Sequence, residues 1–164
     1  MTVDKLNCLR YAGGMDAAHY RLEESLGFMT ITAHRMLQST LRRRLRAAGL
    51  ELSPEQWGIL VVLWERGGMT QDELTHVFCA DKSSMSRVLA LLEERGLVER
   101  RVDADNERRK IVRATQAALA VRGPGFDTSA AILRGAVAGL APEEVATCLR
   151  VLAAIKDNLR DGAA

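Results

Sequence analysis

The residues best suited to chemistry lie on one predicted helix, which begins at Asp81 and ends near Arg95. Its apolar side chains recur at the spacing of one buried face, and a short polar face lies opposite. Small hydroxyl side chains let a helix approach a DNA backbone closely, and an arginine can donate two hydrogen bonds to guanine in the major groove. The pattern also fits an amphipathic helix whose polar face is only solvated. The apolar face comprises Met85, Val88, Leu89 and Leu92, and the polar face comprises Ser83, Ser86, Arg87, Ala90 and Glu94.

A second group of charges gathers further along the chain, where a β-hairpin is predicted with strands at 97–102 and 110–113 and a long polar tip between them. A basic hairpin can reach DNA phosphates or enter a narrow minor groove. Acidic residues alternate with the basic ones, so salt bridges within the tip are the alternative interpretation. The basic residues are Arg100, Arg101, Arg108, Arg109, Lys110 and Arg113, and the acidic ones are Asp103, Asp105 and Glu107.

The elements that must position these two groups can be predicted from start and stop signals. Ser53-Pro54-Glu55-Gln56 and Thr70-Gln71-Asp72-Glu73 are both typical of a capping box, and Asp81 offers a third helix start. A long helix is predicted over 20–48, and two more after the hairpin, from Thr115 and from Pro142. Gly123-Pro124-Gly125 should kink or split the first of these two. The order predicts a mainly α fold with a small β-hairpin wing, a winged helix-turn-helix.

The outer helices carry apolar stripes that the small central domain has no obvious place for. We therefore expect a DNA-binding domain at 49–114, and helices in 1–48 and 115–164 that form a dimerisation region in a homodimer.

Composition limits the class of protein. The chain has 164 residues, 48% of them hydrophobic, and a formal net charge of only +2, so affinity for DNA must come from local clusters of basic residues. The sequence has no apolar run long enough to cross a membrane and no signal sequence at its start, which predicts a cytoplasmic protein.

Other reactive residues form no recognisable site. There is no nucleophile with a base, no phosphate-binding glycine loop and no metal spacing among the three histidines, so neither catalysis nor a cofactor or metal is expected. His34 is interpreted as an interface residue rather than part of a ligand pocket. The basic run at 42–46 suits a solvated helix end, with phosphate contact as the alternative. A protein-binding adaptor would show apolar anchors where this helix shows Arg87.

The three cysteines are too far apart in sequence to suggest a disulfide framework or a zinc site. Cys79 and Cys148 fall on apolar stripes and are expected to be buried. Cys8 lies in a loose N-terminal arm, where a plain thiol is favoured over a peroxide sensor.

The segment from Asp81 to Val98 resembles the recognition helix of the MarR (multiple antibiotic resistance regulator) family and its exit into the wing. The wing pattern of that family is matched by Asp103, Arg108 and Thr115, and 52–57 resembles its second-helix entry. Asn106, Ala114 and Ala118 depart from the pattern and put the geometry of the wing tip in question. The specific motifs are confined to 52–115, within a similarity that covers about 20–160.

The resemblance implies a transcriptional regulator, expected to be a repressor, that binds a pseudo-palindromic operator in double-stranded DNA as a homodimer. It also implies a possible small-molecule effector that releases the DNA. The expected DNA-binding residues are Lys82, Ser83, Ser84, Ser86, Arg87, Asp103, Arg108, Arg109 and Lys110.

Overall fold

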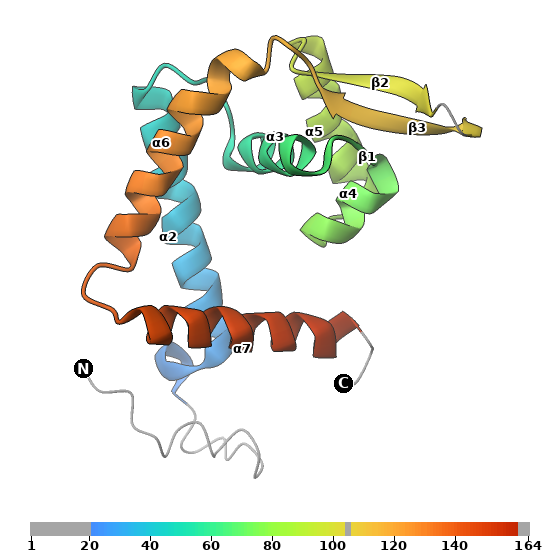
Figure 1. Cartoon of the computed structure of the whole chain (residues 1–164). Helices are drawn as coiled ribbons and strands as arrows, with labels where there is room; N and C mark the ends of the chain where they lie inside the picture. The colour runs from blue at the N-terminus through green and yellow to red at the C-terminus, as the bar shows by residue number, and fades with distance from the viewer. Residues whose placement is uncertain (1–20, 104–105, 161–164) are drawn as a thin grey trace.

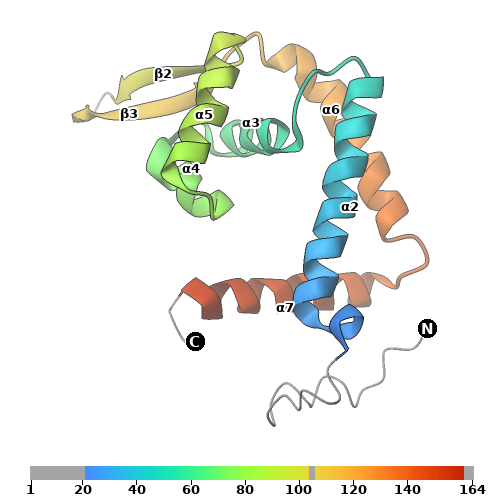
Figure 2. The same ribbon diagram turned by 180° about the vertical axis from the view of Figure 1, so that it is seen from behind.

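Two long helices, α2 (Leu26–Ala47) and α6 (Leu119–Ala136), lie side by side and form a stem to which the other elements are attached (Figures 1 and 2). The computed structural model describes residues 21–103 and 106–160, without the side chains of residues 107 and 108. A short 3₁₀ turn, η2 (Leu22–Glu24), precedes α2, and the Ser25 hydroxyl caps α2 by accepting from the Phe28 backbone N–H at 3.2 Å. The last helix, α7 (Pro142–Arg160), leaves the end of the stem.

The winged lobe lies to one side of the stem. It contains three helices, α3 (Pro54–Arg66), α4 (Gln71–Phe78) and α5 (Lys82–Glu94), and three short strands, β1 (Met69–Thr70), β2 (Val98–Asp103) and β3 (Asn106–Ala114). The strands form an antiparallel sheet in the order β1-β3-β2. The predicted mainly α fold with a small β wing is thereby confirmed. The sequence signals did not indicate β1, whose second residue, Thr70, is also the N-cap of α4.

Each helix of the lobe begins where its capping signal predicts. Ser53 and Gln56 form a complete capping box on α3, with Pro54 at the first helical position, and Thr70 and Glu73 form another on α4. These caps satisfy backbone N–H groups that a helix start otherwise leaves unpaired. Gly67 ends α3 in the left-handed conformation, at a φ of 73°, which glycine adopts without a Cβ penalty.

The core of the lobe is built from aliphatic side chains of every helix and of the sheet. Leu60, Leu74, Leu89 and Leu92 have no exposed surface, and Val112 of β3 closes the core on the sheet side. The predicted apolar face of α5 is therefore the buried face, with Val88 half-buried at its margin. Burial of each such side chain stabilises the fold by roughly 1.5–3 kcal/mol.

The tip of the hairpin is shorter than predicted, because β3 begins at Asn106 rather than at Lys110. Val102 pairs with Lys110 and Asp103 pairs with Asn106, so residues 107–109 fall in an irregularity of the register. A bulge of this kind keeps a polar segment in the sheet while it interrupts the ladder locally. The sequence pattern failed here because such a bulge disturbs the alternation by which a strand is recognised.

Helix α6 runs without a break through Gly123-Pro124-Gly125, so of the two predicted effects the split is wrong and the kink stays a prediction. Proline removes only one backbone donor, which would otherwise bond to the Ala120 carbonyl, and the helix tolerates that loss. Packing against α3 explains the glycine at 125. Trp57, Trp64 and Phe126 form an aromatic cluster between the two helices, with ring centroids 5.3–6.2 Å apart. A Cβ at Gly125 would lie 2.2 Å from the Trp57 ring.

None of the helices in the described residues has the length and apolar character needed to cross a membrane.

We predict that Gly125→Ala lowers the free energy of unfolding by about 1–3 kcal/mol, the usual cost of overpacking a core. The buried Trp57 ring cannot move aside without disturbing its aromatic neighbours. Gly27→Ala is the matched control, since a Cβ there meets nothing within 4 Å. It should leave stability unchanged or raise it by up to about 1 kcal/mol. Urea unfolding followed by circular dichroism, at one protein concentration, measures the free energy of unfolding of both variants. Equal values for Gly125→Ala and Gly27→Ala would contradict the close approach of Gly125 to the Trp57 ring.

Candidate nucleic-acid interface

The start of α5 is held by its N-cap, Asp81. One carboxylate oxygen of Asp81 accepts hydrogen bonds from the Ser83 hydroxyl at 2.6 Å and from the Ser84 backbone N–H at 2.7 Å. The Ser83 hydroxyl and then the Ser84 backbone N–H hold the pKa of Asp81 well below its usual range. The carboxylate is therefore charged at neutral pH, and it uses a backbone donor that an isolated helix end would offer to a phosphate.

The polar face of α5 is exposed, as predicted. Ser83, Ser86, Arg87 and Ala90 all lie at the surface, on the side of the helix opposite Met85, Leu89 and Leu92. Arg87 forms no ion pair within the described ranges, so its guanidinium is available to a ligand. Ser84 is half-buried beside the cap, and we assign it to the helix start rather than to the exposed face.

Lys82, at the first position of α5, is exposed and forms an ion pair with a residue of α4. Its Nζ lies 3.1 Å from an Asp72 carboxylate oxygen on α4, so this ion pair spans the turn between the two helices. The pair is exposed on both sides and therefore contributes little to stability. Lys82 can exchange it for a phosphate at small cost.

The wing places its basic residues in different environments. Lys110 is exposed on β3, whereas the side chain of Arg108 is outside the described part of the structure. Arg109 contacts two carboxylates: its Nη2 lies 2.7 Å from Glu73 on α4, and its Nε lies 3.6 Å from Asp103 on β2. The alternative interpretation of the tip, salt bridges between its own basic and acidic residues, therefore holds for Arg109 and Asp103.

Two other predicted cations of the wing are also paired. Arg100 on β2 lies 2.9 Å from Glu93 of α5, and Arg101 lies 2.7 Å from Glu99 of its own strand. The first pair connects the wing to the end of α5. Both arginines are thereby less available to DNA than their clustering in the sequence suggests.

Sequence reasoning did not identify Glu73 as part of this region beyond its role in a capping box. The residue was recognisable as a helix start, but its partner Arg109 is 36 positions away. No local pattern indicates a pairing over that separation. The β1–β3 strand pairing, which the sequence signals also did not indicate, places β3 next to the start of α4.

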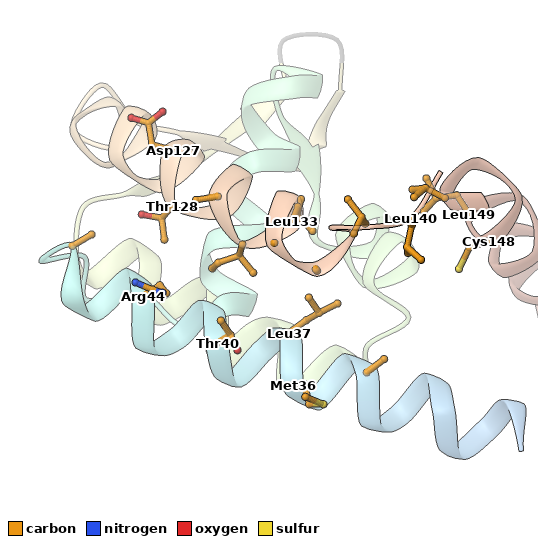
Figure 3. Close-up of a pocket in the computed structure, with 18 of the residues that line it drawn as sticks. Met36, Leu37, Thr40, Arg44, Asp127, Thr128, Leu133, Leu140, Cys148 and Leu149 are labelled. Atoms are coloured by element: carbon orange, nitrogen blue, oxygen red, sulfur yellow. The ribbon is translucent and has the colours of Figure 1, made fainter. Parts of the chain in front are cut away.

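A long apolar groove lies between α2, α6 and the start of α7, on the stem rather than on the winged lobe (Figure 3). It encloses about 1210 Å³. In Figure 3, Met36, Leu37, Thr40 and Arg44 follow one another along α2, and Leu133 projects from α6 on the opposite side. Leu140, Cys148 and Leu149 continue the apolar lining beyond the end of α6.

Both described cysteines are exposed, so the prediction that they are buried is wrong. Cys79 ends α4 in a left-handed conformation, at a φ of 48°, and this turn position places its side chain outside the core. Cys148 lies on the apolar face of α7 and lines the open groove, and no residue of α7 is buried among the described residues. Cys8 lies outside the described residues. Within the described ranges, no three His, Cys, Asp or Glu side chains are grouped as metal ligands.

Comparisons with known proteins agree with this geometry. Residues 52–110, from the start of α3 into the wing, match the model of the MarR family. No curated protein sequence matches the chain.

Solved structures resemble the chain over most of its length. A protein from Pseudomonas aeruginosa described as a probable transcriptional regulator is 31% identical, with a TM-score of 0.69 over 82% of this chain and 99% of its own. A MarR-family transcriptional regulator from Silicibacter pomeroyi is 26% identical, with a TM-score of 0.73 over 88% of this chain and 96% of its own.

CouR from Rhodococcus jostii RHA1, in a structure bound to p-coumaroyl-CoA, shares the fold at 24% identity. Its TM-score is 0.72 over 82% of this chain and 94% of its own. The matched domain, the similarity over nearly the whole of these proteins, and the winged lobe with its exposed arginine lead to one conclusion: the chain belongs to the MarR family of transcriptional regulators.

Proposed function

We propose that the chain binds double-stranded DNA sequence-specifically, with α5 in the major groove and the β2–β3 wing against the adjacent backbone or minor groove. The observation that carries this proposal is the exposed, unpaired Arg87 at the centre of a hydroxyl-bearing helix face, beside a basic wing. A guanidinium in that position can bind the O6 and N7 atoms of guanine together.

We propose a division of roles among the nine expected DNA-binding residues, in which the role of Arg108 rests on the resemblance of the wing alone. Arg87 reads bases, with Ser83 and Ser86 beside it. Lys82, Lys110 and Arg108 bind phosphates. Ser84, Asp103 and Arg109 hold the local structure, since the first belongs to the cap and the other two are paired. Because the Asp81 carboxylate accepts the Ser84 backbone N–H and places a negative charge at the start of α5, a phosphate bound there depends mainly on Lys82.

We propose that the binding unit is a homodimer formed by α2, α6 and α7, the helices outside the domain at 49–114. Helix α7 buries none of its residues, and large apolar side chains remain exposed on all three helices, among them Met36 at 72%, Leu149 at 64% and Leu159 at 69%. A groove of about 1210 Å³ exceeds the roughly 300–1,000 Å³ typical of small-molecule sites. The second copy, whose own apolar helices match the groove in character, is the occupant that we propose. A two-fold dimer would present two α5 helices to half-sites of a pseudo-palindrome.

We infer that the bound dimer acts in the cytoplasm as a repressor, since a dimer seated on a promoter excludes RNA polymerase from the same DNA. A reporter gene placed behind the operator should be expressed more strongly when the chain is absent. Lower expression in its absence would contradict repression.

We further propose that a small aromatic acid releases the DNA by binding between stem and winged lobe. The Trp64 indole N–H is buried with no acceptor among the described residues, and the Arg122 guanidinium lies 5.6 Å from the centre of the same ring. An aromatic carboxylate could stack there and pair with Arg122. Titration of such acids should quench tryptophan fluorescence and weaken DNA binding together. Quenching with unchanged DNA affinity would contradict an effector role.

We predict that Arg87→Ala and Arg108→Ala weaken DNA binding in different ways. Loss of Arg87 should reduce the preference for the operator over unrelated DNA by about 1–3 kcal/mol. Loss of Arg108 should weaken binding to both DNAs and lower the salt dependence by about one phosphate contact. Mobility shifts on the DNA upstream of the protein's own gene, at several salt concentrations, measure these effects.

Arg87→Lys is the control, because it keeps the charge and loses the two-pronged donor geometry. It should retain affinity for unrelated DNA and lose the preference for the operator. If both alanine variants bind like the parent, the assignment of the interface is wrong.

We predict that Leu149→Asp raises the dimer dissociation constant at least about 100-fold, since each copy would bury a charge in place of a leucine worth roughly 1.5–3 kcal/mol. Thr147→Asp, an exposed position on the opposite face of α7, should remain dimeric. Light scattering coupled to size-exclusion chromatography distinguishes the two. A Leu149→Asp variant whose dimer dissociation constant equals that of the parent, measured over a dilution series into the nanomolar range, would refute this interface.

A further inference from the structure

We propose that Glu73 is a positioning residue that orients the wing for DNA, so that its negative charge strengthens the binding of a polyanion. This inference rests on the proposed DNA-binding function and concerns a residue of α4 outside the expected DNA-binding set.

The carboxylate of Glu73 uses its two oxygens for two different segments. One oxygen accepts the Thr70 backbone N–H at 2.7 Å and completes the capping box of α4. The other accepts from the Arg109 guanidinium on β3 at 2.7 Å. A single side chain therefore connects the start of the helix-turn-helix unit to the return strand of the wing.

Arg109 lies on a part of β3 that backbone pairing holds only weakly, so its contact with Glu73 adds a restraint there. Backbone pairing with β1 holds β3 only at Ile111 and Val112, nearer the base of the wing. Residues 107–109 lie in the bulge, where the ladder with β2 is interrupted. The Glu73 contact thus holds the wing on the tip side of the β1 ladder, at the place where backbone pairing is weakest.

Arg109 in turn joins three elements rather than extending freely toward solvent. Its Nε lies 3.6 Å from Asp103 of β2 while its Nη2 lies 2.7 Å from Glu73 of α4. With its guanidinium between two carboxylates, Arg109 is a connector between α4 and both strands of the wing. It is less suited to be a phosphate ligand, because a phosphate would have to displace these partners.

The charge state of Glu73 is consistent with this role. The hydrogen bond from the Thr70 backbone N–H, with smaller contributions from the Thr70 hydroxyl and the Arg109 charge, lowers the pKa of Glu73. The carboxylate therefore stays charged at neutral pH, and protonation would weaken the contact only as the pH falls through this lowered pKa.

The direction in which Glu73→Gln changes the dissociation constant for DNA tests the proposal. Glu73→Gln keeps an oxygen that can accept the Thr70 N–H and removes the negative charge. Simple electrostatics predicts that losing a negative charge near DNA strengthens binding. The positioning role predicts the opposite, a dissociation constant at least about threefold higher.

Asp72→Asn is the matched control, because it removes the neighbouring negative charge from the same helical turn and leaves the wing contact intact. Its partner Lys82 is freed, so its DNA affinity should be equal to or higher than that of the parent. Loss of the negative charge at residue 73 would then weaken DNA binding, whereas loss of the adjacent charge at residue 72 would not. Charge alone does not account for such a difference.

A second measurement needs no DNA. Amide hydrogen exchange of the β3 segment at 106–110 should accelerate in Glu73→Gln and stay at the parent rate in Asp72→Asn, while the exchange of α5 is unchanged in both. This readout separates a loosened wing from a general loss of stability.

Arg109→Gln completes a double-mutant cycle. If Arg109 acts through Glu73, the double variant binds DNA no more weakly than Arg109→Gln alone. The inference is overturned if Glu73→Gln binds DNA as tightly as the parent and its amide hydrogen exchange at 106–110 is unchanged. It is also overturned if the losses of DNA-binding free energy in Glu73→Gln and Arg109→Gln add in the double variant. If the parent shows no salt-sensitive DNA binding, both the proposed function and this inference fail. If the parent binds DNA and Glu73→Gln changes neither the affinity nor the hydrogen exchange of the wing, only this inference fails.

Discussion

The burial of one face of α5 in the core of the winged lobe is the interaction on which the rest of the structure depends. Leu89 and Leu92 are completely buried, together with Leu60 and Leu74 from the neighbouring helices. This packing fixes the rotation of α5 about its axis and thereby directs Arg87 outward. Because the helix can bury only one face, the same aliphatic residues that stabilise the lobe also determine which side chains of α5 stay exposed for the proposed contact with DNA.

The wing must be held relative to that helix, and exposed contacts do this. Glu93–Arg100 connects α5 to β2, and Glu73–Arg109 connects α4 to β3. Pairs of this kind contribute little to stability in water, so their main effect is to fix the position of the wing relative to the helices. The arginines of α5 and the wing therefore include paired connectors and a candidate DNA ligand that is unpaired within the described ranges, Arg87, and the ion-pair partners of each residue distinguish them.

Most of the fold could be predicted from local signals, and the errors have physical causes. Ser53, Thr70 and Asp81 each begin a helix as predicted, because capping chemistry acts over three residues. The course of α6 through Pro124 could not be predicted, since it depends on packing. The roles of Arg109 and Glu73 depend on the pairing of strands far apart in sequence, which no local pattern encodes. The apolar stripe of α7 predicts a buried Cys148, but the residue is exposed, because none of the α7 residues is buried within the described part of the chain.

Hydroxyl-radical footprinting of the operator tests the central claim, that α5 and the wing together form a DNA-binding surface presented twice by a dimer. We expect protected sugars in two clusters on one face of the duplex, separated by about one helical turn or a multiple of it. In the Arg108→Ala variant, protection should weaken at the outer edges, where the wings lie, and persist between them. Uniform protection without this periodicity, or protection that depends on neither α5 nor the wing, would contradict the account.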